Sequence, residues 1–247
     1  MDIRDQIADW LRDYLVDSGA DGFVLGLSGG VDSATAAGLA VLAVGPESVL
    51  TAILPCHSDP LDRQLAEQVI RAFSLRSVTI SLDDAFDALM ERLPPTQHRL
   101  AIANIKPRLR MTALYYLAQT HNYLVLGAGN KSELLVGYST KYGDAGVDLL
   151  PLGDLYKTEV WQLARELGVP REVVERPPSA GLWPGQTDED ELGIAYEELD
   201  RVLEAIVSGE RERVDPDTLE KVKGMISSSA HKRTLPPVYR RPQAQPR

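Results

Sequence analysis

Hydrophobic and polar positions along this chain follow two different periods, and the change from one to the other predicts strands and helices in turn. Short apolar runs bounded by turn residues predict buried strands at 23–27, 49–54, 77–81 and 123–127. Apolar residues spaced three or four positions apart predict helices at 3–17, 34–44, 61–73, 83–91, 105–119 and 160–167. Strands that alternate with helices predict a parallel sheet covered by helices on both faces.

Two of these helices carry expectations about individual residues. The helix 3–17 is amphipathic, and its expected apolar side consists of Ile7, Trp10, Leu11, Tyr14 and Leu15. Asn104 is expected to cap the helix 105–119, with Pro107 tolerated in the first turn. Either helix has a surface suited to contact with a second copy of the chain, although the pattern is equally typical of core packing.

A polar, glycine-rich loop separates the first predicted strand from the helix that follows it. It reads Ser28-Gly29-Gly30-Val31-Asp32-Ser33. A glycine turn in this place exposes backbone N–H groups at a helix N-terminus, where they bind phosphate oxygens. The loop lacks the lysine of a Walker A sequence. Its order resembles the pyrophosphate loop of enzymes that split ATP between the α- and β-phosphates, although a strand–turn–helix connection can need glycine for its turn alone.

A second polar sequence follows the strand 123–127 and reads Gly127-Ala128-Gly129-Asn130-Lys131-Ser132-Glu133. In a doubly wound sheet, ligands bind beyond the carboxyl ends of strands at the point where the winding reverses. We therefore expect 23–27 and 123–127 to be neighbours. Mg²⁺ prefers one or two carboxylates together with phosphate oxygens, so Asp32 and Glu133 form a candidate pair. Taken alone, Asp32 could be a helix-end charge and Glu133 a surface residue.

Composition narrows the class of protein. A chain of 247 residues with 44% hydrophobic and 25% charged residues can bury one sizeable core. We expect a single domain over 1–247, with a flexible Pro-rich tail at 235–247. The formal net charge of −10 argues against nonspecific nucleic-acid binding. The acidic runs 188–191 and 197–200 are interpreted mostly as solvated helix faces.

The single cysteine, Cys56, excludes an intrachain disulfide and favours a reducing compartment. Its neighbour His57 suggests a nucleophile–base pair, but adjacent residues rarely have that geometry, so Cys56 is expected to be a small apolar filler near the nucleotide. The sequence contains no apolar run of membrane-spanning length and no N-terminal secretory pattern. We therefore expect a cytoplasmic protein that binds neither membrane nor nucleic acid.

Five segments carry further specific motifs, in order along the chain. They are Asn104-Ile105-Lys106-Pro107-Arg108-Leu109-Arg110, Gly129-Asn130-Lys131-Ser132-Glu133, Pro151-Leu152-Gly153-Asp154-Leu155-Tyr156-Lys157-Thr158, the segment 178–189 and His231-Lys232-Arg233. With them the chain resembles NAD synthetase over nearly its whole length. The resemblance implies a doubly wound, adenine-nucleotide α-hydrolase-like and Rossmann-like fold. It also implies a ligase that amidates deamido-NAD with free ammonia and ATP, through an adenylated intermediate with release of pyrophosphate and AMP.

The resemblance also implies roles for individual residues. The ATP-binding set comprises Gly26, Leu27, Ser28, Gly29, Gly30, Val31, Asp32, Ser33, Ala128, Lys157 and Ser179. The residues implied to contact deamido-NAD are Arg108, Lys141, Asp148, His231 and Lys232. Asp32 and Glu133 would hold Mg²⁺, and these two with Lys157 are the expected catalytic residues. Without the resemblance, the lysines would be interpreted as solvated surface residues, Asp148 as a loop acid and His231 as a surface histidine.

The chain departs from the family pattern at two positions. Ala128 stands where the family more often has threonine, which leaves only backbone contact to ATP there, and Ser179 replaces a threonine but keeps the hydroxyl. The resemblance further implies a homodimer and a chain without a glutaminase domain. The alternatives are another ATP pyrophosphatase, such as a GMP synthetase core or a tRNA-thiolating enzyme, and a nucleotide-sensing module without turnover. One cysteine and an acidic charge disfavour thiolation, and retained metal and phosphate ligands disfavour a sensor.

Overall fold

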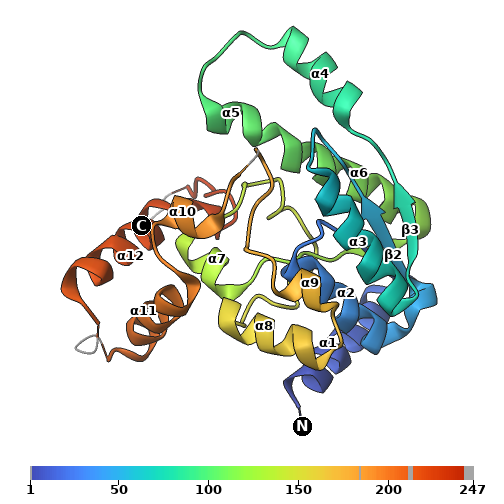
Figure 1. Cartoon of the computed structure of the whole chain (residues 1–247), viewed down its shortest axis with the longest axis horizontal. Helices are drawn as coiled ribbons and strands as arrows, with labels where there is room; N and C mark the ends of the chain where they lie inside the picture. The colour runs from blue at the N-terminus through green and yellow to red at the C-terminus, as the bar shows by residue number, and fades with distance from the viewer. Residues whose placement is uncertain (1, 184, 211–213, 242–247) are drawn as a thin grey trace, which may run out of the picture.

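A parallel sheet lies at the centre of the molecule. The computed structural model describes residues 2–183, 185–210 and 214–241, and in this part of the chain four strands pair in the order β3-β2-β1-β4 (Figure 1). Their bounds are Gly22–Gly26 for β1, Val49–Ile53 for β2, Arg76–Thr79 for β3 and Tyr123–Val125 for β4. The chain winds outward from β1 to β3 and then returns to place β4 on the other side of β1. This confirms that the two predicted strands followed by polar loops are neighbours at the reversal of winding.

Helices connect and surround these strands. They are α1 Ile3–Ser18, α2 Val31–Val44, α3 Pro60–Phe73, α4 Asp83–Arg92, α5 Arg99–Ala103, α6 Ile105–His121, α7 Lys131–Val136, α8 Lys157–Glu166, α9 Arg171–Val174, α10 Asp188–Leu192, α11 Tyr196–Ser208 and α12 Pro216–Ser228, with 3-10 turns η1 Pro46–Ser48 and η3 Ala230–Lys232. Every predicted strand and helix is present. Two helices begin three residues earlier than predicted, at Val31 and Lys157, which places Asp32 and Lys157 in the first turn of a helix.

The sheet has an apolar core on each face because successive strand side chains point in opposite directions. In β1, Phe23 and Leu25 pack with residues of α1, α2, α3, α8 and α9. Val24 between them packs on the other face with residues of α6 and with Phe86 of α4. The expectation of helices on both faces of a parallel sheet is therefore confirmed.

The apolar side of α1 is narrower than predicted. Leu11 and Leu15 are buried, but Trp10 and Tyr14 are 43% and 42% exposed, with their ring centroids 6.1 Å apart. Asn104 stands at the N-cap position of α6, as predicted, but its side chain makes no capping bond to this helix. The same residue also ends α5, and its Oδ1 accepts a hydrogen bond from Thr140 Oγ1 at 2.9 Å.

A third apolar cluster lies beside the sheet and was not foreseen from the sequence. It joins α7, α10, α11 and α12, and its fully buried members include Tyr196, Leu199 and Leu203. In Figure 1, α10, α11 and α12 are drawn in orange and red and lie next to α7 and α8. Because α7 follows the polar sequence after β4, the cluster lies next to that sequence.

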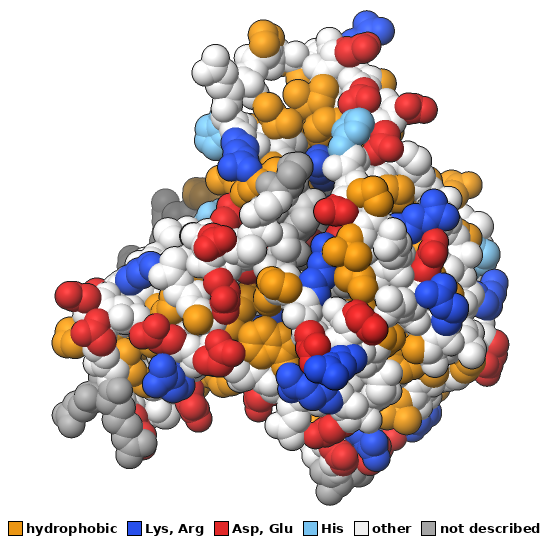
Figure 2. Space-filling view, in the orientation of Figure 1, with side chains coloured by type: hydrophobic (Ala, Val, Ile, Leu, Met, Phe, Trp, Pro, Cys, Tyr) orange, Lys and Arg blue, Asp and Glu red, His pale blue; other side chains and the backbone are white. Residues whose placement is uncertain are grey.

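Charged side chains are distributed over the surface. On the face shown in Figure 2, acidic side chains alternate with basic ones, without a continuous basic area among the described residues. No described helix has the length and apolar character that crossing a bilayer requires. A single domain over 1–247 and a flexible tail stay predictions, and 242–247 of that tail lie outside the described residues.

Candidate nucleotide site at the switch point

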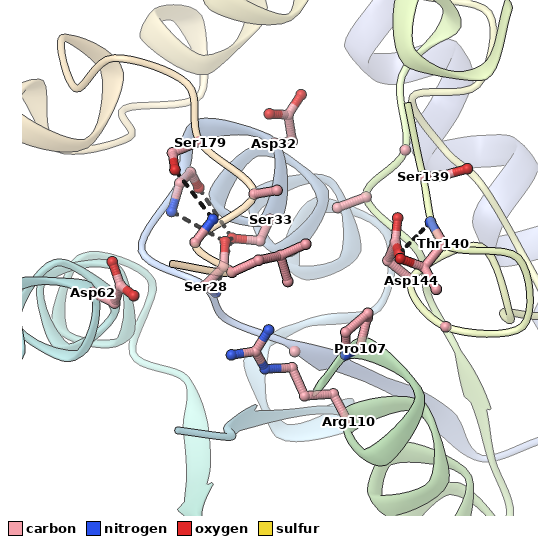
Figure 3. A pocket seen from close by; sticks show the side chains of 18 of the residues that line it. Ser28, Asp32, Ser33, Asp62, Pro107, Arg110, Ser139, Thr140, Asp144 and Ser179 are labelled. Carbon is pink, nitrogen blue, oxygen red and sulfur yellow. Dashed lines mark hydrogen bonds between the residues drawn. The ribbon is translucent and has the colours of Figure 1, made fainter. Parts of the chain in front are cut away.

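The loop between β1 and α2 has the geometry of an anion-binding turn. Gly29 has a φ of +79°, and a Cβ at this position would lie 2.4 Å from the carbonyl oxygen of Asp62, so only glycine fits. Gly30 caps α2 in an extended conformation without a side-chain hydrogen bond. Ser33 Oγ accepts from Ser28 N at 3.3 Å and donates to the Gly30 carbonyl at 3.0 Å (Figure 3). The loop is closed upon itself, and the first N–H groups of α2 stay available to a ligand.

A cavity of about 800 Å³ opens over this loop, at the carboxyl ends of β1 and β4. This volume is in the range of small-molecule sites. The predicted nucleotide residues that line it are Gly26, Leu27, Ser28, Gly30, Val31, Asp32, Ser33, Ala128, Lys157 and Ser179, and Glu133 lines it as well. Of the predicted ATP set, Gly29 alone is not part of the cavity wall, because it turns toward α3.

Lys157 is the central charge of the site. Its side chain is only 1% exposed, and its Nζ pairs closely with Asp32 Oδ2 and lies 3.8 Å from Glu133 Oε1. Burial by itself would lower the pKa of Lys157, but the two carboxylates outweigh burial and raise this pKa to about 12. The ammonium is therefore charged at neutral pH. Because its side chain is buried, Lys157 is not a solvated surface lysine.

The two carboxylates beside Lys157 are held by α7. Asn130 caps this helix, and its Nδ2 donates to Asp32 Oδ1 at 2.9 Å. Glu133 Oε2 accepts from Asn130 N at 3.1 Å, which completes a capping box. Burial, followed by the charge of Asp32, raises the pKa of Glu133, and Lys157 opposes this rise. Neither carboxylate is a free surface charge.

The carboxylates near Lys157 are candidate ligands of a magnesium ion. Over the described ranges, no group of three or more His, Cys, Asp or Glu residues is placed to hold a metal. Asp32 and Glu133 supply two carboxylates on one wall of the cavity. Two carboxylates fit Mg²⁺ when phosphate oxygens and water complete its shell, so the residues fit an ion that arrives with a nucleotide.

The residues predicted to contact deamido-NAD do not meet in one place. Lys232 lines the cavity, and its Nζ donates to the carbonyls of Gly137 and Ser139 at 2.7 Å each. The other three basic residues form a chain of contacts beside it. Arg108 Nη2 donates to the Lys141 carbonyl at 3.3 Å, and Lys141 Nζ donates to the His231 carbonyl at 2.7 Å.

Asp148 lies apart from these residues, in a second hollow of about 530 Å³. This hollow is lined by Thr112, Tyr115, Tyr116, Ala118, Gln119, Tyr123 and Asp148. Asp148 accepts hydrogen bonds from Tyr115 OH at 2.9 Å and from Val125 N at 2.8 Å. Burial, together with the bond to Asp148, raises the pKa of Tyr115 to about 12. Tyr115 is therefore a neutral donor at neutral pH.

Comparison with known proteins places these features in a family. The family model for NAD synthase matches residues 3–236. This chain belongs to the NAD synthase family. It is 50% identical over 238 residues to the NH(3)-dependent NAD(+) synthetase of Syntrophomonas wolfei, covering 94% of this chain and 93% of that protein.

Solved structures show the same fold. The NMN synthetase of Francisella tularensis superposes with a TM-score of 0.89 at 38% identity, over 96% of this chain and 97% of that one. The NH3-dependent NAD synthetase of Campylobacter jejuni, in complex with the nitrate ion, superposes with a TM-score of 0.84 at 28% identity, over 97% and 100%. The expected Rossmann-like, adenine-nucleotide α-hydrolase-like fold is confirmed.

Arg110 lines the cavity, although the sequence singled it out only as the last residue of the motif 104–110. Its side chain lies on the cavity wall (Figure 3). Its Nε donates to the Leu54 carbonyl and its Nη2 to Ser58 Oγ, each at 3.1 Å. Burial lowers the pKa of Arg110 from its ordinary value. The helical periodicity of α6 could have placed Arg110 on the side that faces the sheet. It cannot show that a cavity lies on that side.

The interpretation of the acidic runs as solvated faces is wrong for one residue in each run. Asp188 is buried on the cavity wall, and its Oδ2 accepts from Tyr196 OH at 3.2 Å. Asp200 is buried against α8. Burial raises the pKa of Asp188, and Lys157 opposes the rise. Consecutive acidic residues carry no signal that separates the buried member from its exposed neighbours.

Cys56 does not pair with its neighbour. The thiol is fully buried in the cluster between the sheet, α4 and α6, and its Sγ lies 3.9 Å from the Leu82 carbonyl oxygen. His57 Nε2 bonds instead to Asp87 Oδ1 at 2.8 Å. Burial raises the pKa of Cys56. The geometry fits an apolar filler, located behind the cavity wall rather than on it.

Proposed function

We propose that this chain amidates deamido-NAD to NAD, using ATP and free ammonia. The observation that carries the proposal is the position of Lys157, buried between Asp32 and Glu133 directly beside a glycine turn at a helix N-terminus. This combination suits a polyphosphate and a cation together. Membership of the NAD synthase family supplies the acceptor, because relatives at 50% identity are named NH(3)-dependent NAD(+) synthetases.

The first chemical step is the activation of a carboxylate. The nicotinate carboxylate of deamido-NAD attacks the α-phosphorus of ATP, the bond from that phosphorus to the bridging oxygen breaks, and pyrophosphate leaves. The N–H groups at the start of α2 bind the leaving pyrophosphate, and Lys157 places a positive charge beside it. Ser179, which also lines the cavity, offers a hydroxyl. Such fixed charges and dipoles stabilise negative charge that develops during the reaction.

The second step forms the amide. Ammonia attacks the acyl carbon of the adenylated carboxyl group, the bond to AMP breaks, and the extra proton leaves to solvent. No covalent enzyme nucleophile is needed, in agreement with the burial of Cys56. The protein contributes mainly by holding both substrates in line.

Asp32 and Glu133 would hold Mg²⁺ together with the ATP phosphates. The ion, when bound, neutralises charge on the phosphate oxygens. Lys157 shares the two carboxylates and keeps them close to the phosphate loop. Asn130 fixes their direction through Asp32 Oδ1 and the capping box.

We assign the contacts of deamido-NAD outside the main cavity to two further surfaces. Arg108, Lys141, His231 and Lys232 bring basic groups to one side, suited to phosphate or carboxylate oxygens. Asp148 offers acceptors in the second hollow on α6. A homodimer through α6 would cover that hollow, since Tyr116 at its rim is 71% exposed.

A second candidate substrate is the deamidated mononucleotide, whose amidation gives NMN. The structural likeness to the NMN synthetase of Francisella tularensis favours it, because that likeness extends over nearly the whole of both chains. The chemistry at ATP is the same for both acceptors. The two candidates differ only in whether the second hollow receives the adenylyl half of the substrate.

The test is an assay of the purified chain with ATP, Mg²⁺, ammonium and either acceptor, with NAD or NMN and pyrophosphate measured together. We expect equal amounts of NAD and pyrophosphate with deamido-NAD, and little product when glutamine replaces ammonium. Higher kcat/KM with nicotinate mononucleotide would favour the second candidate. Absence of pyrophosphate release with both acceptors would overturn the proposal.

A further inference from the structure

Helix α11 reaches Lys157 from outside the sheet. It belongs to the cluster that joins α7, α10 and α12, and none of its described residues lines the nucleotide cavity. Nevertheless two residues of this helix, one turn apart, reach the first turn of α8. Tyr196 contacts the side chain of Lys157, and Asp200 accepts a hydrogen bond from the backbone of Thr158. Helix α11 therefore contacts Lys157 and its neighbouring backbone directly.

Asp200 holds the backbone at Lys157. Its carboxylate is 5% exposed, with Oδ2 accepting from Thr158 N at 2.9 Å and Oδ1 accepting a close hydrogen bond from Ser132 Oγ. Ser132 Oγ in turn accepts from Lys157 N at 3.0 Å. The first two N–H groups of α8 have no acceptor within their own helix. Here Thr158 N bonds directly to the Asp200 carboxylate, and Lys157 N bonds to the Ser132 hydroxyl, which donates to the same carboxylate.

The same contacts extend to the two acidic residues of the site. Ser132 lies in the first turn of α7, next to Glu133 and two residues after Asn130. Asn130 donates to Asp32, as described above. Asp200 is therefore connected through Ser132 to the short segment that places both carboxylates as well as to the lysine.

Tyr196 acts on the other end of the lysine. Its ring is fully buried, and Lys157 Nζ lies 5.1 Å from the ring centroid, within the range of a cation–π contact. Tyr196 OH donates to Asp188 Oδ2, and Trp161 packs edge-on against the same ring with centroids 6.1 Å apart. The ring is held on two sides, so it limits the directions that the ammonium can take.

We propose that α11 is a positioning element for Lys157, in which Asp200 fixes the backbone of the lysine and Tyr196 fixes its ammonium. A lysine is a point charge on a flexible four-carbon chain, and a charge that stabilises a reaction must be held within a fraction of an ångström. The inference rests on the proposed role of Lys157 at the ATP phosphates. It adds that a helix outside the sheet, none of whose described residues lines the cavity, controls that role.

The variant that tests this is Asp200→Asn. Asparagine keeps the shape of the side chain but replaces one acceptor oxygen by a donor. Either the bond from Thr158 N is lost, or the bond with Ser132 reverses and the Ser132 hydroxyl loses its acceptor. Leu203→Ala is the matched control, because Leu203 is fully buried on the same helix and makes none of these polar contacts. Unfolding in urea, ATP affinity by calorimetry, and kcat and KM for ATP are measured for both.

We expect Asp200→Asn to lower kcat/KM for ATP by about 10- to 100-fold, as loss of supporting contacts commonly does. The kcat/KM of Leu203→Ala for ATP should stay within about twofold of the parent value, although this variant loses as much stability as Asp200→Asn or more. A second measurement combines Asp200→Asn with Lys157→Met. If Asp200 acts through the lysine, its substitution lowers kcat/KM little further once the lysine is gone.

The proposal is overturned if Leu203→Ala impairs kcat/KM as much as Asp200→Asn, or if Asp200→Asn has its full effect without Lys157. Its outcome is separable from that of the proposed function. Should the parent chain bind ATP but make neither NAD nor NMN, the proposed function fails. The ATP affinities of the same variants would then still decide whether Asp200 acts through Lys157.

Discussion

Lys157 shows how the environment of one residue decides its chemistry. A lysine at the start of a helix is ordinarily a solvated charge, but here the side chain lies between two carboxylates and the ring of Tyr196. Burial of a charge is costly unless it is paired, and removal of one partner leaves the others uncompensated. The stability of this cluster and its chemistry therefore depend on the same three charges.

Replacement of Lys157 by methionine should lower both stability and activity. The carboxylates of Asp32 and Glu133, each 17% exposed, would then face each other without a cation, and loss of one partner from a buried ion pair typically costs about 3–5 kcal/mol. Urea unfolding and pyrophosphate release would measure the two effects, and we expect activity to fall by about 100-fold or more. Lys131→Met is the control, because its partner Asp154 is almost wholly exposed and such surface pairs contribute little. Equal stability losses in the two variants would contradict the buried-cluster interpretation.

Cys56 should be inert in the folded protein. Its thiol is fully buried and its pKa is raised by burial, so the reactive thiolate is scarce at neutral pH. We expect a thiol reagent such as dithionitrobenzoate to react only after denaturation. Cys56→Ser should keep ammonia-dependent activity, at a modest cost in stability for burying a hydroxyl. Rapid labelling of native protein, or loss of activity in the serine variant, would show that the thiol has another role.

At the scale of elements, the sequence predicts type and order well because the two hydrophobic periods are distinct along most of the chain. The starts of α2 and α8 were placed three residues late. Their first turns carry polar residues that serve the site, and such residues weaken the apolar pattern. After residue 167 the sequence indicated helix only as the acidic faces at 188–191 and 197–200, which lie in α10 and α11, and it missed α9 and α12. These helices are short or pack in a cluster separate from the sheet.

The turn before α2 gives a prediction at this scale. Gly29→Ala should strain the loop, since alanine disfavours a φ of +79° and its Cβ would collide with the Asp62 carbonyl. We expect a loss of about 2 kcal/mol or more in unfolding free energy, and weaker ATP binding. Gly224→Ala is the matched control within α12, where the added methyl meets open space. There alanine should stabilise the helix by about 1 kcal/mol. Unimpaired ATP binding by Gly29→Ala would argue against the loop as the phosphate site.

At the scale of the molecule, the proposed dimer can be tested through α6. Tyr116 is largely exposed at the rim of the second hollow, a position that suits a buried aromatic contact with another copy. Tyr116→Asp should shift the mass measured by analytical ultracentrifugation from dimer to monomer while helical content is kept. Tyr239→Asp is the control, because Tyr239 is 84% exposed, against 71% for Tyr116, and lies outside the helices. A parent chain that sediments as a monomer would contradict the dimer.

The sequence by itself determined the alternation of strands and helices, the glycine loop, and the residue types that suit a polyphosphate and Mg²⁺. These follow from local periodicity, backbone sterics and side-chain chemistry. The tertiary structure decided which charges are buried together. It brought Lys157 between Asp32 and Glu133, buried Asp188 and Asp200 out of two acidic runs, and left Asp148 in a separate hollow. Burial depends on how elements far apart in the chain pack, and the period of a single segment carries no record of that packing.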